Sequence, residues 1–277
     1  MVNFDQAAGL RRLLSVGLDG LGVKSRYVTF LSALSQNEKN ATIVNLAAGL
    51  VRLGNDVLLL DMHNHETEAA GVVNWLKVDI GLTLVDVANH NQPLQHATHV
   101  TAQGFKIVRF GQNQSTMSEI DSTKSMASEL NELIDQLGNH VDMVLVDGEL
   151  DNTNPLMTEI LARGEIIILV TKHPESIKSA YSLIKRAHCQ FGRRNYGVLV
   201  TNVDEGQAER LYNTIADVAG NFLSVPLTYM GYVPQDDYLR RASLSGVTVL
   251  DAFPKAGASI AFSRVAQQML DVNKELV

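Results

Sequence analysis

Residues 33–40 occupy the place of a phosphate-binding loop, between an apolar strand pattern and an amphipathic helix pattern. Such a loop uses glycines so that backbone N–H groups can wrap phosphates, a lysine for the terminal phosphates, and a Ser or Thr hydroxyl for Mg²⁺. Only the lysine, Lys39, is present. The first and last glycine positions are Ala33 and Glu38, and the hydroxyl position is Asn40. The sequence therefore predicts poor binding of a triphosphate.

The charge of Glu38 strengthens this prediction. Its carboxylate falls where a triphosphate would lie, and also at the positive end of the following helix. We expect Glu38 to occupy the loop's own anion site and to pair with Lys39, and we expect no cofactor. The alternative is that Glu38 points into solvent while Lys39 holds ATP with Mg²⁺.

Two further carboxylates follow apolar strand patterns. Asp61 and Asp147 should point at the crevice above the carboxyl edge of the sheet, where an NTPase holds magnesium. Because poor binding of a triphosphate is expected and the Ser or Thr ligand is missing, we interpret Asp61 and Asp147 as relics of such a site or as helix-capping groups. Alternate residues of 61–65, Asp-Met-His-Asn-His, form a weak metal-site pattern, but loop histidines are usually solvated and no further ligand set is evident. No metal site is expected.

Short Val-, Ile- and Leu-rich runs alternate with stretches of helical period, which is typical of an α/β fold with a mostly parallel sheet flanked by helices on both faces. Gly54 should end the first helix of this fold. The expected strands are 27–32, 57–61, 106–110, 143–146, 166–170, 198–201 and 227–231, and the expected helices include 126–137, 177–188, 207–219 and 259–276.

Composition narrows the function classes. The 277 residues carry a net charge of -7, which disfavours direct binding of nucleic acid. The single cysteine, Cys189, fits a reducing cytoplasm, and no apolar run is long enough to span a membrane. The last helix has few cations, so membrane association is expected to be weak at most. No nucleophile motif points to a hydrolase of another kind.

The first residues differ from the rest. A short helix is predicted at 4–14, and Gly17, Gly20 and Gly22 then form a flexible tether. We therefore divide the chain into an N-terminal helix with its flexible linker, 1–25, and one α/β domain, 26–277.

Several short stretches match the motifs of one protein family in the same order along the chain, although each match alone is weak. They are 34–41 followed by Asn45-Leu46-Ala47, 57–61, 144–147, 170–176, Asn202, and 231–236. Together they resemble the phosphate loop, the strands leading into switch I and switch II, and later segments of the MinD/ParA superfamily of deviant P-loop ATPases. The resemblance implies a single P-loop NTPase-like domain. It also implies that Asn202 takes the place of an asparagine that contacts adenine in relatives.

The front of the chain resembles one branch of that superfamily. Asp5-Gln6-Ala7-Ala8-Gly9-Leu10-Arg11 is similar to the helix by which FlhG/FleN-type regulators of flagellar number engage the SRP-type GTPase FlhF. By this resemblance Asp5, Gln6, Leu10 and Arg11 contact the partner, and Gln6 completes its GTP site. The alternative is a plain helix that docks on its own domain.

Departures from the family pattern affect three parts of the ATPase machinery. Leu34 replaces the lysine that reaches a partner's γ-phosphate, His63 replaces the switch I aspartate, and 148–151 read Gly-Glu-Leu-Asp in place of the usual switch II turn. The resemblance then implies a non-hydrolysing regulator of flagellar number, placement or gene expression. It would act through FlhF or a flagellar transcription activator, at the cell pole, and as a monomer by default.

Two other functions stay open. One is an atypical ATPase in which Lys39, Asp61, Asp147 and Asn202 suffice for nucleotide binding. The other is an adaptor for another polar machine, such as a pilus or a polysaccharide export system.

Overall fold

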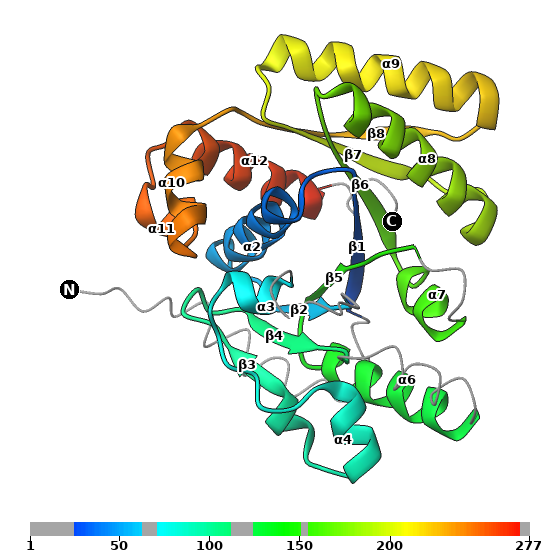
Figure 1. Ribbon diagram of the computed structural model, residues 1–277, viewed down its shortest axis with the longest axis vertical. Coiled ribbons are helices and arrows are strands. Elements are labelled where there is room, and N and C mark those ends of the chain that lie inside the picture. The colour runs from blue at the N-terminus through cyan, green and yellow to red at the C-terminus, as the bar shows by residue number, and fades with distance from the viewer. Residues whose placement is uncertain (1–24, 63–70, 112–123, 151–154, 272–277) are drawn as a thin grey trace.

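The computed structural model describes residues 25–62, 71–111, 124–150 and 155–271. The predicted N-terminal helix at 4–14, His63 and His65, and the chain beyond Asp271 lie outside these ranges. Figure 1 shows a central sheet with helices on both sides. The prediction of an α/β fold with a mostly parallel sheet and helices on both faces is confirmed.

An eight-stranded sheet forms the centre, in the order β3-β4-β2-β5-β1-β6-β7-β8. Every neighbouring pair is parallel except β3 with β4. The inner strands β2 and β5 are buried along their whole length, as expected for parallel strands covered on both faces. The strands are β1 Arg26–Ser32, β2 Val57–Asp61, β3 Thr98–Val100, β4 Lys106–Arg109, β5 Met143–Asp147, β6 Glu165–Thr171, β7 Tyr196–Thr201 and β8 Leu227–Val233.

Helices cover the two faces in separate groups, each with its own apolar cluster. One face carries α2 Gln36–Arg52, α3 Val72–Trp75, α10 Asp237–Ser245, α11 Val249–Ala252 and α12 Gly257–Asp271. The other carries α4 Leu84–His90, η1 Leu94–Ala97, α6 Lys124–Gly138, α7 Pro155–Leu161, α8 Pro174–Phe191 and α9 Glu205–Leu223.

The helix α2 carries the loop at its start and is buried over most of its length. Ile43, Leu46 and Leu50 recur at helical spacing and are fully buried, and the helix ends before Gly54, which has a φ of 85°. Such a φ suits glycine because it has no Cβ. The predicted stop at Gly54 is therefore confirmed, and the loop is presented from a rigid element.

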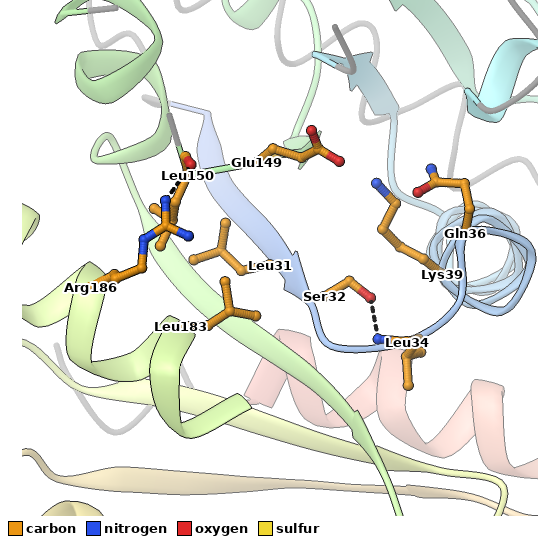
Figure 2. A pocket seen from close by; sticks show the side chains of 10 residues that line it. Leu31, Ser32, Leu34, Gln36, Lys39, Glu149, Leu150, Leu183 and Arg186 are labelled. Atoms are coloured by element: carbon orange, nitrogen blue, oxygen red, sulfur yellow. Dashed lines mark hydrogen bonds between the residues drawn. The ribbon is translucent and has the colours of Figure 1, made fainter. Parts of the chain in front are cut away.

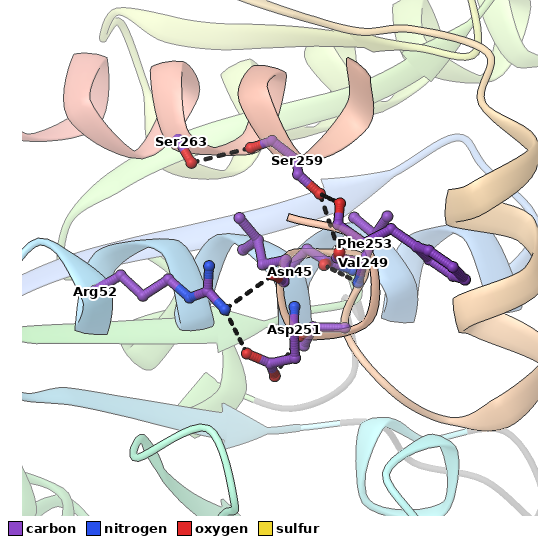
Figure 3. Close-up of polar contacts among 9 residues, drawn as sticks. Asn45, Arg52, Val249, Asp251, Phe253, Ser259 and Ser263 are labelled. Carbon is purple, nitrogen blue, oxygen red and sulfur yellow. Dashed lines mark hydrogen bonds and ion pairs between the residues drawn. The ribbon is translucent and has the colours of Figure 1, made fainter. Parts of the chain in front are cut away.

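Polar contacts fasten α2 to the last part of the chain (Figure 3). The fully buried Asn45 accepts a hydrogen bond at 2.9 Å from the backbone N–H of Val249, and its amide donates at 2.7 Å to the carbonyl oxygen of Ala41. Near the end of α2, Arg52 donates to the carboxylate of Asp251 at 2.6 Å. These contacts fix the helix that bears the loop against α11.

The first strand and the last helix are also joined. Arg26 forms two hydrogen bonds of 2.6 Å with the carboxylate of Glu165 on β6, and its guanidinium also donates to the carbonyl oxygen of Met269 in the last turn of α12. The guanidinium fork suits this double use because its donors point in fixed directions. The start of β1 therefore lies beside the end of α12.

Candidate functional site

The loop after β1 folds without any glycine. Ala33 donates its backbone N–H to the carbonyl oxygen of Leu169 at 2.9 Å, and Leu34 donates to the hydroxyl of Ser32 at 3.0 Å. None of the loop residues has a positive φ. The loop therefore uses ordinary backbone conformations, whereas a phosphate-wrapping loop relies on those that glycine makes accessible.

Glu38 lies at the beginning of α2 and binds the loop itself. One of its carboxylate oxygens accepts hydrogen bonds from the hydroxyl of Ser35 at 2.6 Å and from the backbone N–H of Ser35 at 3.3 Å. This is the capping-box arrangement, in which the third helical residue reaches back to the residue that starts the helix. The carboxylate thus lies at the anion-binding end of α2.

Lys39 pairs across the sheet edge with Asp147. Its Nζ atom lies 2.8 Å from Oδ1 of Asp147, and both side chains are almost completely buried. The prediction that Lys39 would pair with Glu38 is therefore wrong. Consecutive helical residues point about 100° apart, so Glu38 faces Ser35 while Lys39 faces the end of β5.

Asp61 lies next to this pair. It is opposite Asp147 in the register of β2 with β5, and one of its oxygens accepts a hydrogen bond of 3.4 Å from the backbone N–H of Val73 in α3. A Cβ atom on Gly71 would lie 2.7 Å from the same oxygen, so a side chain at this position would push the Asp61 carboxylate out of place. Asp61 therefore holds the start of α3, in agreement with its interpretation as a helix-capping group.

Asn40 is buried, and its side-chain oxygen accepts a hydrogen bond of 3.2 Å from the amide of Gln36. Asn202 lies elsewhere. It has a φ of 61°, and it lines a cavity of about 260 Å³ with Asn37, Glu38 and residues of α10. A second cavity lies beside Lys39 and shares no lining residue with the first. The structure therefore brings Lys39, Asp61 and Asp147 together but leaves Asn202 on the other side of the start of α2.

The cavity beside Lys39 measures about 330 Å³ (Figure 2). Two charged residues line it that were not among the predicted site residues: Glu149, which the sequence placed only within the altered switch II turn, and Arg186, which sequence reasoning missed. Arg186 of α8 donates a hydrogen bond of 2.6 Å to the carbonyl oxygen of Leu150 and so holds the turn after β5. The only sign of this contact in the sequence is that Arg186 is a basic residue on the polar side of the helix that follows β6.

These side chains do not fit Mg-ATP. Glu38 places a negative charge at the helix end that would bind phosphate, Lys39 is already paired, and position 40 has no hydroxyl for the metal. Among the described residues, no group of three or more His, Cys, Asp or Glu side chains is placed to hold a metal ion. In those same residues, no helix is long and apolar enough to cross a membrane.

Known proteins that are similar to this chain were found by sequence and by structure. No protein-family model matches. The antiactivator FleN of Pseudomonas aeruginosa is 30% identical over 232 residues, which cover 83% of this chain and 81% of FleN. The MinD protein of Pyrococcus horikoshii, solved in complex with Mg-ADP, matches with a TM-score of 0.65 and 20% identity over 88% of this chain and 96% of its own.

A ParA-family ATPase of Chlorobium tepidum matches equally well, with a TM-score of 0.65 and 18% identity over 88% of this chain and 98% of its own. The two solved structures establish the fold, and the extent of identity with FleN establishes the branch. The chain belongs to the FlhG/FleN-type branch of the MinD/ParA superfamily.

Proposed function

We propose that this chain regulates flagellar number, flagellar placement or flagellar gene expression by protein contact, without hydrolysing a nucleotide. Two findings support the proposal. Its relative in Pseudomonas aeruginosa is the antiactivator FleN, and a role of this kind suits contact with a protein partner. In addition, the buried ion pair between Lys39 and Asp147 uses the one lysine of the loop inside the domain.

The ion pair carries the argument against hydrolysis. For Lys39 to bind a phosphate, it would have to leave a carboxylate that is itself fully buried, and separating a buried pair costs several kcal/mol, about 3–5. Glu38 adds repulsion at the same helix end. Both effects oppose ATP, and nothing in the loop compensates for them.

Calorimetric titration with Mg-ATP tests this proposal. We expect no binding tighter than millimolar for the wild-type chain, and micromolar binding would overturn the pseudo-ATPase claim. A matched variant that carries Ala33→Gly, Glu38→Gly and Asn40→Thr restores the two glycine positions and the hydroxyl position, and it should bind more tightly than the wild type. Equal heats for the two proteins would show that these positions do not decide nucleotide binding.

Protein partners form the second part of the proposal. A flagellar transcription activator would contact the domain surface, and the SRP-type GTPase FlhF would contact Asp5, Gln6, Leu10 and Arg11 near a cell pole. GTPase stimulation by the wild type and by Gln6→Ala tests the N-terminal helix with its linker, residues 1–25, which we call the arm. Equal rates would remove Gln6 from the proposal, whereas a lower rate for the variant supports it. We expect the chain to be a monomer in the Mg-ATP titration and in the GTPase assay.

One observation favours an atypical ATPase as the second candidate. Lys39, Asp61 and Asp147 lie together at the carboxyl edge of the sheet, where nucleotides bind in this fold class. This candidate predicts a measurable ATP turnover that Lys39→Ala abolishes. Lack of turnover in the wild-type protein would exclude it.

A further inference from the structure

An apolar groove of about 390 Å³ lies between β8 and α12, away from the Lys39 cavity. We call it the β8–α12 groove and define it by the residues Glu205, Tyr229, Gly231, Tyr232, Pro234, Gly257, Ile260, Ala261, Arg264, Val265 and Gln268. Ile260 leaves 47% of its surface exposed at one wall of the groove. The groove is concave and has this branched side chain at its wall, so an apolar segment that docked there would bury apolar area.

The occupant is not an added β-strand. Although β8 is an edge strand, two of its backbone carbonyls are already used. Gln268 of α12 donates to the carbonyl oxygen of Tyr229 at 2.7 Å, and the hydroxyl of Tyr212 donates to that of Leu227 at 2.7 Å. A further strand needs those acceptors for its own N–H groups. The groove instead suits a segment that packs by its side chains, such as an amphipathic helix.

The chain upstream of β1 leaves the domain near this groove. Arg26 donates to the carbonyl oxygen of Met269, and the adjacent Gln268 lines the groove. In the sheet, β1 is separated from β8 by β6 and β7. Three strand spacings of about 4.8 Å amount to about 14 Å. Residues 15–24 can span up to about 33 Å when extended, so the predicted helix at 4–14 can reach the groove.

The predicted helix has a suitable apolar side. At 100° per residue, Leu10, Leu14 and Ala7 form an apolar strip about 60° wide, which Gln6 and Arg11 flank. Leu10 also belongs to the residues proposed above to contact the partner, so the groove and the partner would compete for the same face. A tethered segment competes at a high effective concentration, in the millimolar range for a short flexible linker.

We propose that the N-terminal helix, 4–14, occupies the β8–α12 groove when no partner is bound, and that partner binding requires its release. This proposal rests on the proposed role of the arm in partner binding. In the free protein the apolar side of the helix is buried in the groove and cannot contact a partner. A partner must therefore bind this side more tightly than the groove does. Ile260 is the groove residue on which the contact depends most, because its side chain is the most exposed large apolar group there.

Disulfide trapping in the full chain tests the proposal. In a Cys189→Ser background, Ala7→Cys is combined with Arg264→Cys in the groove, or with Val100→Cys as the matched control. Val100 is 63% exposed on β3, at the opposite edge of the sheet and four strands from β1. An arm that does not dock would reach both positions at similar rates, whereas docking should make the groove disulfide form about tenfold faster.

The same assay tests the contact residue. Ile260→Arg should reduce the groove rate to that of the Val100→Cys control, and Ile260→Val should preserve it. Equal rates at positions 264 and 100, no effect of Ile260→Arg, or a disulfide that joins two chains would each overturn the proposal. The assay uses neither nucleotide nor partner. Its failure therefore leaves the proposed function standing, and micromolar ATP binding would not affect the docking result.

Discussion

Lys39 and Asp147 form an ion pair of 2.8 Å that joins the first turn of α2 to the end of β5 beneath the loop. The preceding residue, Glu38, faces Ser35. The loop therefore separates its two charges, with the cation inside the domain and the carboxylate at the helix end. In this arrangement Lys39 holds α2 and β5 together, while Glu38 caps the start of α2.

Breaking the buried ion pair should be costly. We expect Lys39→Met to lower the free energy of unfolding by about 3–5 kcal/mol, because it removes the ammonium from a buried carboxylate. Urea unfolding measures the loss, and adding Asp147→Asn to Lys39→Met should recover part of it. As a control, Lys178→Met breaks an exposed pair with Glu175 and should change stability by less than about 1 kcal/mol. A neutral Lys39→Met would contradict the structural role of the pair.

Asn45 should also be important for stability. Asn45→Ala leaves the backbone N–H of Val249 unsatisfied inside the protein, which costs about 1–3 kcal/mol. Chemical denaturation measures the change, and Asn213→Ala on the exposed side of α9 is the matched control with an expected change near zero. If the two variants were equally stable, the contact between α2 and α11 would not contribute as proposed.

Asp251 should make stability fall in acid. Burial opposes ionisation of its carboxyl group, but hydrogen bonds from Thr248 and Arg52 outweigh burial and lower the pKa below the ordinary value of 3.8. The resulting stability is present above pH 3.8 and is lost as the pH falls through the lower pKa of the folded state. Since the side chain is 44% exposed, the contribution should be below about 1 kcal/mol.

The difference between wild type and Asp251→Asn, followed by denaturation between pH 7 and pH 3, measures this contribution. The difference should shrink toward the acid end. Asp237→Asn, at a carboxylate that is 86% exposed, is the control. A difference that stayed constant with pH would exclude ionisation of Asp251 as its source.

Tyr229 should make stability fall in alkali. Burial raises the pKa of its phenol from 10.0 to about 12, with a further contribution from the charge of Glu209. Because the pKa of the folded state is the higher one, the wild type is fully stable below pH 10 and loses stability as the pH rises toward 12. Within the described part of the chain, the hydroxyl has no hydrogen-bond partner.

Tyr229→Phe should therefore be close to neutral at pH 7 and should reduce the alkaline loss of stability, as thermal unfolding across the pH range would show; the pKa values of Tyr27, Tyr196 and Tyr212 are raised by burial too and account for the remainder. Tyr238→Phe, at a ring that is 48% exposed, is the control and should retain the loss. If Tyr229→Phe were strongly destabilising at pH 7, its hydroxyl would have an essential partner.

The main strands could be predicted because each is a continuous apolar run between helical patterns. β3 was not predicted, since Thr98, His99 and Val100 form a short, partly exposed edge strand with no such run. Its position depends on pairing with β4, which is not encoded within its own three residues.

Local rules also predicted the site in part. The place of Glu38 follows from its position in the first turn of a helix, which sequence spacing reveals. The partner of Lys39 does not, because Asp147 lies 108 residues later and reaches the loop only through the pairing of β1 with β5. The contact of Arg186 with Leu150 likewise depends on how α8 packs, which spacing alone does not determine.

The link between Arg26 and the last turn of α12 makes the two ends of the domain neighbours. A domain with adjacent ends tolerates circular permutation, because a short linker can join them while new ends open in a surface loop. Residues 1–24 could then be attached at an end far from α12 without altering the sheet. In such a rearranged protein, the effect of the arm's sequence could be distinguished from the effect of its point of attachment.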